Sequence, residues 1–107
     1  MSDILAFRST TPTVVLKVND EDFDMTQISI CHVTIENDSG RNKKIFSDCQ
    51  LDNEYKTISF TMSQEDTLSY ESGTLLLQVK IKLVNDSVLA SPIIRTTMEK
   101  ILEEDIL

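Results

Sequence analysis

The sequence predicts an all-β domain, built as a small antiparallel β-sandwich or barrel. Apolar and polar residues alternate over a long stretch, and this period of two is typical of a strand with one buried face. Turn residues recur about every ten positions, and no alternation of strands with long helices indicates a parallel sheet. The 107 residues fit one domain, residues 1–107, in which we expect residues 98–107 to form an interaction tail.

The longest predicted strand covers residues 75–83, where every second side chain is apolar. The residues between them are mostly polar, so one face of this strand should be buried and the other solvated. The same alternation predicts strands at residues 14–18, after Pro12, and at residues 58–62. The apolar positions of the long strand are Leu75, Leu77, Val79, Ile81 and Leu83.

Residues 28–36 are also predicted to form a strand, with an irregularity in it. A change of apolar phase along this segment indicates a β-bulge or burial on both faces. The turn residues at 37–40 then lead to a short strand at 44–46, so we expect a hairpin. After the long strand, a turn at 85–87 precedes one or two returning strand segments within residues 88–97, interrupted at Pro92. The phase change runs from Ile28 and Ile30 to Cys31, Val33 and Ile35.

One short helical turn is predicted at about residues 63–70. Ser63 can accept a hydrogen bond from a free amide of the first turn, and Asp66 occupies the reciprocal capping position. Gly73 follows as the residue at which the chain leaves the turn. We expect Tyr70 to pack at a corner of the sandwich with its hydroxyl hydrogen-bonded.

The last ten residues depart from the strand pattern. Their apolar residues lie at helical spacing among acidic ones, so a helix and an extended acidic tail both fit. Apolar side chains beyond the reach of a sandwich core are candidates for burial on another chain, and packing back on their own domain is the alternative. The candidate protein-interface residues are Met98, Ile101, Leu102, Ile106 and Leu107.

The charge balance argues against partners rich in phosphate. Asp and Glu number 18 against 10 Lys and Arg, which gives a formal net charge of −8. A surface of this sign repels nucleic acid and anionic lipid. No stretch approaches the roughly 20 apolar residues of a membrane-spanning helix, and the N-terminal residues lack the order of a signal peptide. We therefore expect no membrane insertion, no signal peptide and synthesis in the cytoplasm.

No pattern of residues indicates catalysis. The one histidine, His32, lies within a predicted strand and has no recognisable nucleophile or orienting partner. Cys31 and Cys49 are too few for a zinc site, and we expect both to be free thiols. The acidic run at residues 20–24 resembles a calcium loop at its start, but it lacks the glycine and the final glutamate, so a solvated loop is expected. The sequence therefore predicts no enzyme, no cofactor and no metal.

Three stretches of the chain together resemble a known group of proteins. Residues 7–13, residues 63–68 with Gly73 and Gln78-Val79, and residues 89–93 occur here in a recognisable order and spacing. They resemble small proteins encoded among the tail genes of bacteriophages and prophages of Gram-positive bacteria. More loosely, they are similar to the N-terminal domain of phage baseplate upper proteins. The resemblance covers nearly the whole chain, and its motifs are structural.

The resemblance implies an immunoglobulin-like β-sandwich that docks to other virion proteins. For a structural protein of this kind we also expect contacts between copies of the chain, as a homo-oligomer. The expected function is that of a non-enzymatic tail or baseplate accessory protein, made in the host cytoplasm and then incorporated into the virion. The alternative is a standalone binding module, such as a phage-encoded inhibitor of a host protein or a host-surface-binding domain. An inhibitor could use the acidic surface to occupy a basic site on its partner.

Overall fold

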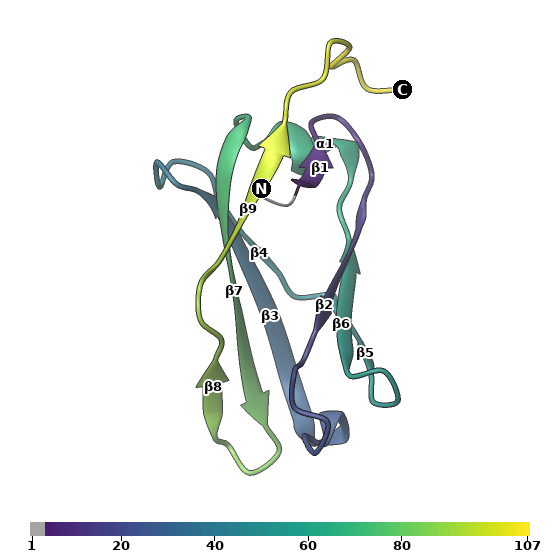
Figure 1. The fold of residues 1–107 in the computed structure, drawn as a ribbon, viewed down its shortest axis with the longest axis vertical. Coiled ribbons are helices and arrows are strands. Elements are labelled where there is room, and N and C mark those ends of the chain that lie inside the picture. The colour runs from purple at the N-terminus through teal and green to yellow at the C-terminus, as the bar shows by residue number, and fades with distance from the viewer. Residues whose placement is uncertain (1–3) are drawn as a thin grey trace.

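The computed structural model describes residues 4–107 and shows the predicted all-β sandwich (Figure 1). One sheet has six strands in the order β1-β9-β7-β3-β4, with β8 paired to the lower part of β7. The other sheet has three strands in the order β2-β6-β5. The strands are β1 (Ile4–Phe7), β2 (Thr13–Lys17), β3 (Ile28–Asn37), β4 (Lys43–Phe46), β5 (Gln50–Asp52), β6 (Thr57–Thr61), β7 (Gly73–Leu83), β8 (Val88–Ala90) and β9 (Ile94–Glu99).

Two helical turns complete the fold. A 3₁₀ turn, η1 (Met25–Gln27), precedes β3, and a short helix, α1 (Gln64–Leu68), connects β6 to β7. Ser63 and Asp66 form the predicted capping box, because the Ser63 hydroxyl accepts from the Asp66 amide and the Asp66 carboxylate accepts from the Ser63 amide. The predicted helical turn is thus confirmed, with a shorter helix than the expected span.

Most strand pairs are antiparallel, and one pair is parallel. The long strands β3 and β7 pair from Ile28↔Leu83 to Asn37↔Leu75, with the predicted irregularity between Ile28 and Ile30. The predicted hairpin is formed by β3 and β4. The exception is β1, which runs parallel to β9 at the edge of the larger sheet. Neither β1 nor β5 was expected from the sequence, because neither short segment shows an alternating pattern.

The core lies between the two sheets. Phe46 of β4 and Phe60 of β6 bring their ring centroids within 4.9 Å, so this aromatic stack joins the larger sheet to the smaller one. Val33, Ile35, Leu75 and Leu77 are fully enclosed from the long strands. The other buried apolar residues are Ala6, Val14, Met25, Cys31, Ile58, Met62, Tyr70 and Met98.

Burial along β7 changes from one end of the sandwich to the other. Leu75 and Leu77 are fully buried, whereas Val79, Ile81 and Leu83 are only half-buried although they share the same face. In the upper part of Figure 1, β9 runs beside β7, and lower down the short, exposed β8 takes its place. The alternation predicted one continuous buried face, but along β7 the structure encloses the side chains fully only toward the end that holds α1.

Hydrogen bonds secure that end of the sandwich, which we call the α1 end. The Tyr70 hydroxyl donates to the carbonyl of Ile35 at 2.8 Å, which confirms the expected corner. Thr67 accepts from the Thr10 amide at 3.0 Å and donates to the Thr10 carbonyl at 2.9 Å. Arg8 donates to the carbonyls of Tyr70 and Leu68. These bonds tie the segment between β1 and β2 to α1 and to the end of β3.

Candidate interaction surfaces

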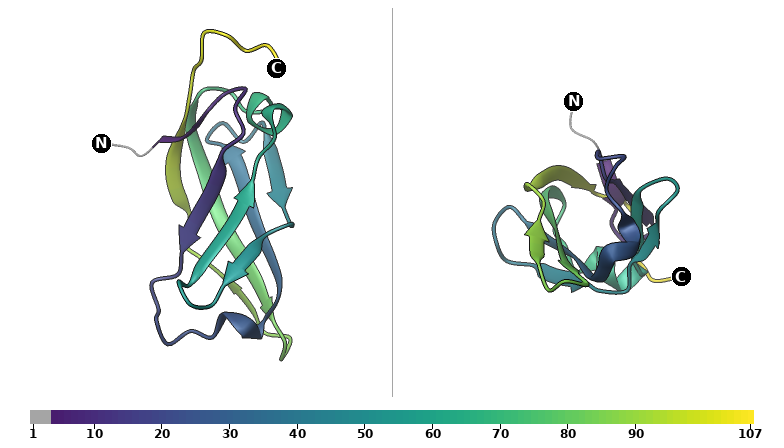
Figure 2. Two further views of the ribbon diagram at one scale, coloured as in Figure 1. Left: turned by 90° about the vertical axis from the view of Figure 1, so that its right-hand side faces the viewer. Right: turned by 90° about the horizontal axis from the view of Figure 1, so that it is seen from below.

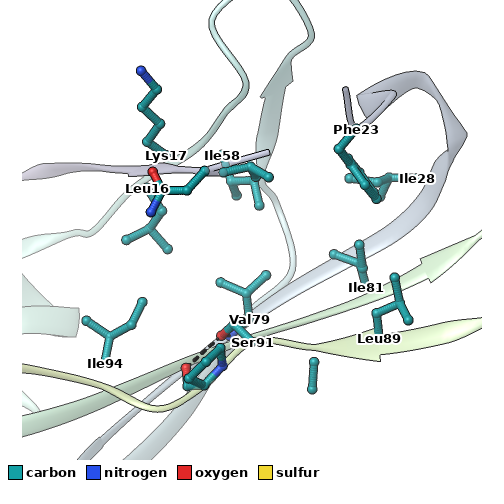
Figure 3. Close-up of a pocket in the computed structure, with 14 residues that line it drawn as sticks. Leu16, Lys17, Phe23, Ile28, Ile58, Val79, Ile81, Leu89, Ser91 and Ile94 are labelled. Carbon is teal, nitrogen blue, oxygen red and sulfur yellow. Dashed lines mark hydrogen bonds between the residues drawn. The ribbon is translucent and has the colours of Figure 1, made fainter. Parts of the chain in front are cut away.

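The sandwich is open along one lateral side, between β2 and the β8–β9 segment. An apolar groove of about 500 Å³ lies there, and its side chains point toward one another from both sheets (Figure 3). Leu16 and Ile58 reach it from the smaller sheet, and Val79, Ile81 and Leu89 reach it from the larger sheet. Within residues 4–107, Lys17 is the only charged residue that lines it. We call this feature the lateral groove.

A second hollow continues the lateral groove toward the α1 end. It lies between β2 on one side and β1 and β9 on the other, and it shares Leu16 and Ile94 with the first. Among the described residues that line this part, Arg95 is the only charged one. The view from below in Figure 2 shows β2 and β8 separated on this side of the molecule. The two hollows together follow β2 along its whole length.

The rim of the groove is an unpaired strand edge. Within the described residues, β2 pairs with β6 alone. The Val18 amide donates to the Lys56 carbonyl, and the Met62 amide donates to the Pro12 carbonyl. The backbone amides and carbonyls of the even-numbered β2 residues therefore point toward β6. Because backbone groups alternate in direction along a strand, those of Thr13, Val15 and Lys17 face away from β6. They form one free edge of the smaller sheet, whose other edge strand is β5.

The opposite lateral side differs in construction and in polarity. There the chain itself crosses between the sheets, since residues 47–49 link β4 of one sheet to β5 of the other. A hollow on this side is lined by several polar groups, including Ser47, Asp48 and Gln50. Cys49 packs against the core here and donates to the Phe46 carbonyl at 3.4 Å. The chain thus covers this side, and the lateral groove is left as the apolar opening.

Neither the groove nor the free edge was predicted from the sequence, although the sequence carries one signal of them. Val14, Val15 and Leu16 are consecutive apolar residues, so strict alternation is broken at Val15, which is 59% exposed. An apolar residue on the solvent phase of a strand marks a surface that another element can cover. The exposed apolar residues of the other rim include Val88, Leu89, Ile93 and Ile94.

The predicted interface residues of the C-terminal segment are divided by the structure. Met98 lies in β9 and is fully buried in its own core, so it offers no surface to a partner. Residues 100–107 form neither helix nor strand, which favours the extended tail over the helix. Leu102 and Leu107 are 98% and 94% exposed, Ile106 is exposed and Ile101 is half-buried. A role for these four residues in docking stays a prediction.

The tail is attached at the α1 end. Arg8 pairs with the Glu104 carboxylate, and the Ser9 hydroxyl contacts the carbonyls of Glu104 and Asp105 at 3.1 Å and 3.2 Å. Figure 1 shows the tail rising beyond the sandwich at this end, away from β8. The tail and the lateral groove are therefore separate surfaces of the molecule.

The reactive side chains do not gather in the groove. Burial raises the pKa of the Cys31 thiol to about 12, with a smaller effect from Cys49. Burial also raises the pKa of Cys49 and that of the Tyr70 hydroxyl. These shifts come from packing in the core, and a thiol of raised pKa is a poor nucleophile. His32 lines a hollow on the outer face of the larger sheet, beside Lys80 and Glu36.

The acidic run at residues 20–24 is an exposed loop whose carboxylates bond to nearby backbone. Asp20 accepts from the Asp22 amide at 3.0 Å, and Asp24 accepts from the Thr26 amide and hydroxyl at 3.0 Å and 2.6 Å. The bonds from Thr26 lower the pKa of Asp24. Phe23 turns inward from this loop and lines the lower end of the lateral groove. Within residues 4–107, no cluster of three or more His, Cys, Asp or Glu side chains is arranged to hold a metal ion.

No helix in the described part of the chain is long and apolar enough to cross a membrane. Comparison with protein-family models, with curated proteins and with solved structures finds no match to this chain. The candidate surfaces therefore stand on the geometry described above.

Proposed function

We propose that this protein is a non-enzymatic structural adaptor of a bacteriophage or prophage tail or baseplate, acting through protein–protein contacts. The observation that carries the proposal is the lateral groove, an apolar opening bordered by an unpaired strand edge. An apolar opening next to free backbone donors and acceptors suits the addition of a strand from another protein chain. The resemblance of residues 7–13, 63–68 and 89–93 to phage tail proteins supplies the biological setting.

The chemistry of the groove supports docking over catalysis. Lys17 is its one titratable lining residue, and catalytic sites bring together a nucleophile, a base and an orienting group. Apolar walls with few charges match the buried centre of a protein interface, where charged residues are depleted. The groove is thus built to bury side chains of a partner.

The sandwich supplies a stiff body for such an adaptor. Its fully buried core and the hydrogen bonds of the α1 end hold the two sheets together beside the groove, whose lining side chains pack against that core. A partner can therefore fill the groove while the fold stays unchanged. The exposed tail residues Leu102, Ile106 and Leu107 provide a second contact at the far end, as expected for an adaptor that links two neighbours.

The test is mass spectrometry of phage particles purified from a culture of cells that carry the gene for this chain. We expect the chain in intact particles, at a constant ratio to the other tail proteins across density-gradient fractions. Its presence in the cell lysate with complete absence from the particles would overturn the proposal.

A second candidate function is a standalone inhibitor of a host protein. The exposed acidic loop at residues 20–24, within a chain of net charge −8, favours this alternative because it can occupy a basic site. An inhibitor is expected in the lysate, bound to a host protein, and its binding should weaken steeply with salt. Docking through the apolar groove should instead survive high salt.

A further inference from the structure

We propose that the free edge of β2 pairs antiparallel with the β2 edge of a second copy of this chain, about a two-fold axis at Val15. This inference deepens the proposed function by naming one occupant of the open side, and it rests on reading that side as a docking surface. Three features of the described residues carry it: the direction of the backbone groups, the pattern of charge and the exposed apolar rim.

The backbone groups of the edge complement themselves. Thr13, Val15 and Lys17 are the β2 residues whose amides and carbonyls face away from β6. An antiparallel pair centred on Val15 sets Val15 opposite Val15 of the second copy and Thr13 opposite Lys17. Each such pair exchanges two hydrogen bonds, and every free group within β2 then has a partner. A centre at Val14 or Leu16 sets Lys17 or Thr13 opposite a residue outside β2.

The charges favour this orientation. In the antiparallel arrangement Lys17 faces Thr13, so no like charges lie opposite each other across the axis. The acidic loops at residues 20–24 follow the two β2 strands at opposite ends. They are separated by at least the length of β2, about 17 Å, which exceeds a screening length of about 8 Å. A parallel pair would place both loops side by side.

The apolar rim gives the pairing its driving force. Val15 is 59% exposed, and on the axis its side chain packs against the same residue of the second copy. The two smaller sheets then form one continuous sheet, and the two lateral grooves face each other across the axis. Each copy thereby covers part of the apolar lining of the other.

The test is sedimentation of the full chain over a concentration series from micromolar to millimolar. We expect a reversible monomer–dimer equilibrium, because a contact of five residues a side is small. Salt should strengthen the dimer, since each copy carries a net charge of −8 and screening reduces the repulsion. A strict monomer at every concentration would overturn the inference. The proposed function would not be affected, because mass spectrometry of purified particles tests it separately.

Variants at Val15 locate the contact. Val15→Lys places two like charges on the axis, so the dimer should weaken roughly tenfold or more, and Val15→Glu should do the same. The matched control is Ile45→Lys on β4, an edge strand of the larger sheet. The exposed fraction of Ile45, 53%, is similar to the 59% of Val15, yet the Ile45→Lys variant should dimerise as the parent does.

A mixture of the two Val15 variants provides the decisive measurement. Val15→Lys and Val15→Glu should form heterodimers when mixed in equal amounts, because Lys and Glu then face each other on the axis. A variant that had merely damaged the fold could not be rescued in this way. A dimer that persists in Val15→Lys, or that Ile45→Lys abolishes, would contradict the β2 interface.

Discussion

The α1 end and the lateral groove use the same two sheets in opposite ways. At the α1 end, polar side chains bridge the segments and the apolar residues are fully enclosed. At the groove, apolar side chains of both sheets face each other across an opening that no segment of the described chain fills. The regions that stabilise this fold are therefore distinct from the surface proposed to dock a partner. The closed end maintains the structure, and the open side is available to a partner.

The buried asparagine at the top of β3 illustrates how the closed end is maintained. Asn37 donates to the Glu71 carbonyl and accepts from the Glu71 amide, at 3.0 Å and 3.1 Å. The same side-chain oxygen also accepts from the Asn42 side chain at 3.0 Å. A buried polar group that is fully satisfied in this way determines a unique arrangement of the chain around it. In the groove, the hydrogen-bonded Ser91 is only half-buried.

Because β7 runs through both regions, two substitutions along it test whether the closed core contributes more to stability than the groove. Leu77→Ala should lower the free energy of unfolding by about 3 kcal/mol or more, because it leaves a cavity in the closed core. Ile81→Ala, on the same face of β7 beside the groove, should cost about half as much or less, since Ile81 is only half-buried. Chemical denaturation of both variants measures the difference, and equal losses would contradict the division into a closed and an open region.

The next effect concerns the corner hydrogen bond. Tyr70→Phe keeps the ring and removes the hydroxyl that donates to Ile35, so we expect a loss of about 1–2 kcal/mol in unfolding free energy. Tyr55→Phe serves as the matched control, because Tyr55 is 66% exposed and should change stability by less than about 0.5 kcal/mol. Thermal and urea unfolding of the pair provide the measurement. A Tyr70→Phe variant with the same unfolding free energy as the parent would show that the corner hydrogen bond does not stabilise the closed end.

A similar loss is expected where α1 meets the start of β2. Thr67→Val keeps the shape of this fully buried side chain but leaves the Thr10 amide without its acceptor. The unsatisfied donor should cost about 1–2 kcal/mol of unfolding free energy. Amide hydrogen exchange should also accelerate at Thr10. Along the β3–β7 pair, exchange should change only as much as the lower free energy of global unfolding requires. Protection at Thr10 equal to that of the parent would contradict the bridging role of Thr67.

The smallest expected effect is a dependence on pH at the α1 cap. Burial raises the pKa of Asp66, but bonds from Lys44 and from the Ser63 amide outweigh it, so the folded pKa is lowered. A carboxyl group with a lowered folded pKa stabilises the fold above its unfolded pKa of about 3.9, and this contribution is lost as the pH falls through the folded value. The stability difference between the parent and Asp66→Asn should therefore vanish in acid. Lys44→Met removes the main partner and should move the transition of Asp66 to higher pH, as followed by denaturation at a series of pH values.

The sequence predicted the parts of the fold that local chemistry determines. The alternation at residues 75–83 located β7, and the pair Ser63 and Asp66 located the start of α1, because side-chain period and capping are properties of short segments. It did not predict β1 or β5, whose three or four residues carry no periodic signal. Met98 was assigned to the tail on helical spacing, and the structure places it in β9, where its register with Ala6 and Gly73 buries it.

The candidate surface could not be predicted in the same way. Whether an edge is free depends on which strands lie beside it, and β2 is an edge only because β1 joins β9 in the other sheet. The half-burial of Val79 and Ile81 likewise follows from the replacement of β9 by the short β8 alongside β7. These are consequences of contacts between distant segments, which no local pattern records. Exposed Val15, the one local signal, becomes meaningful once the topology is known.

The parallel pairing of β1 with β9 also has a mechanical consequence. The two strands run side by side from Ile4↔Thr97 to Phe7↔Glu99, and the Arg8 amide donates to the Glu99 carbonyl beyond them. A force that pulls residue 4 and residue 99 in opposite directions acts along the strands, and it loads these hydrogen bonds together in shear. An antiparallel pair pulled open from one end would lose its bonds one after another. The fold thus resists extension through its first and last strands, a property suited to a part that transmits tension.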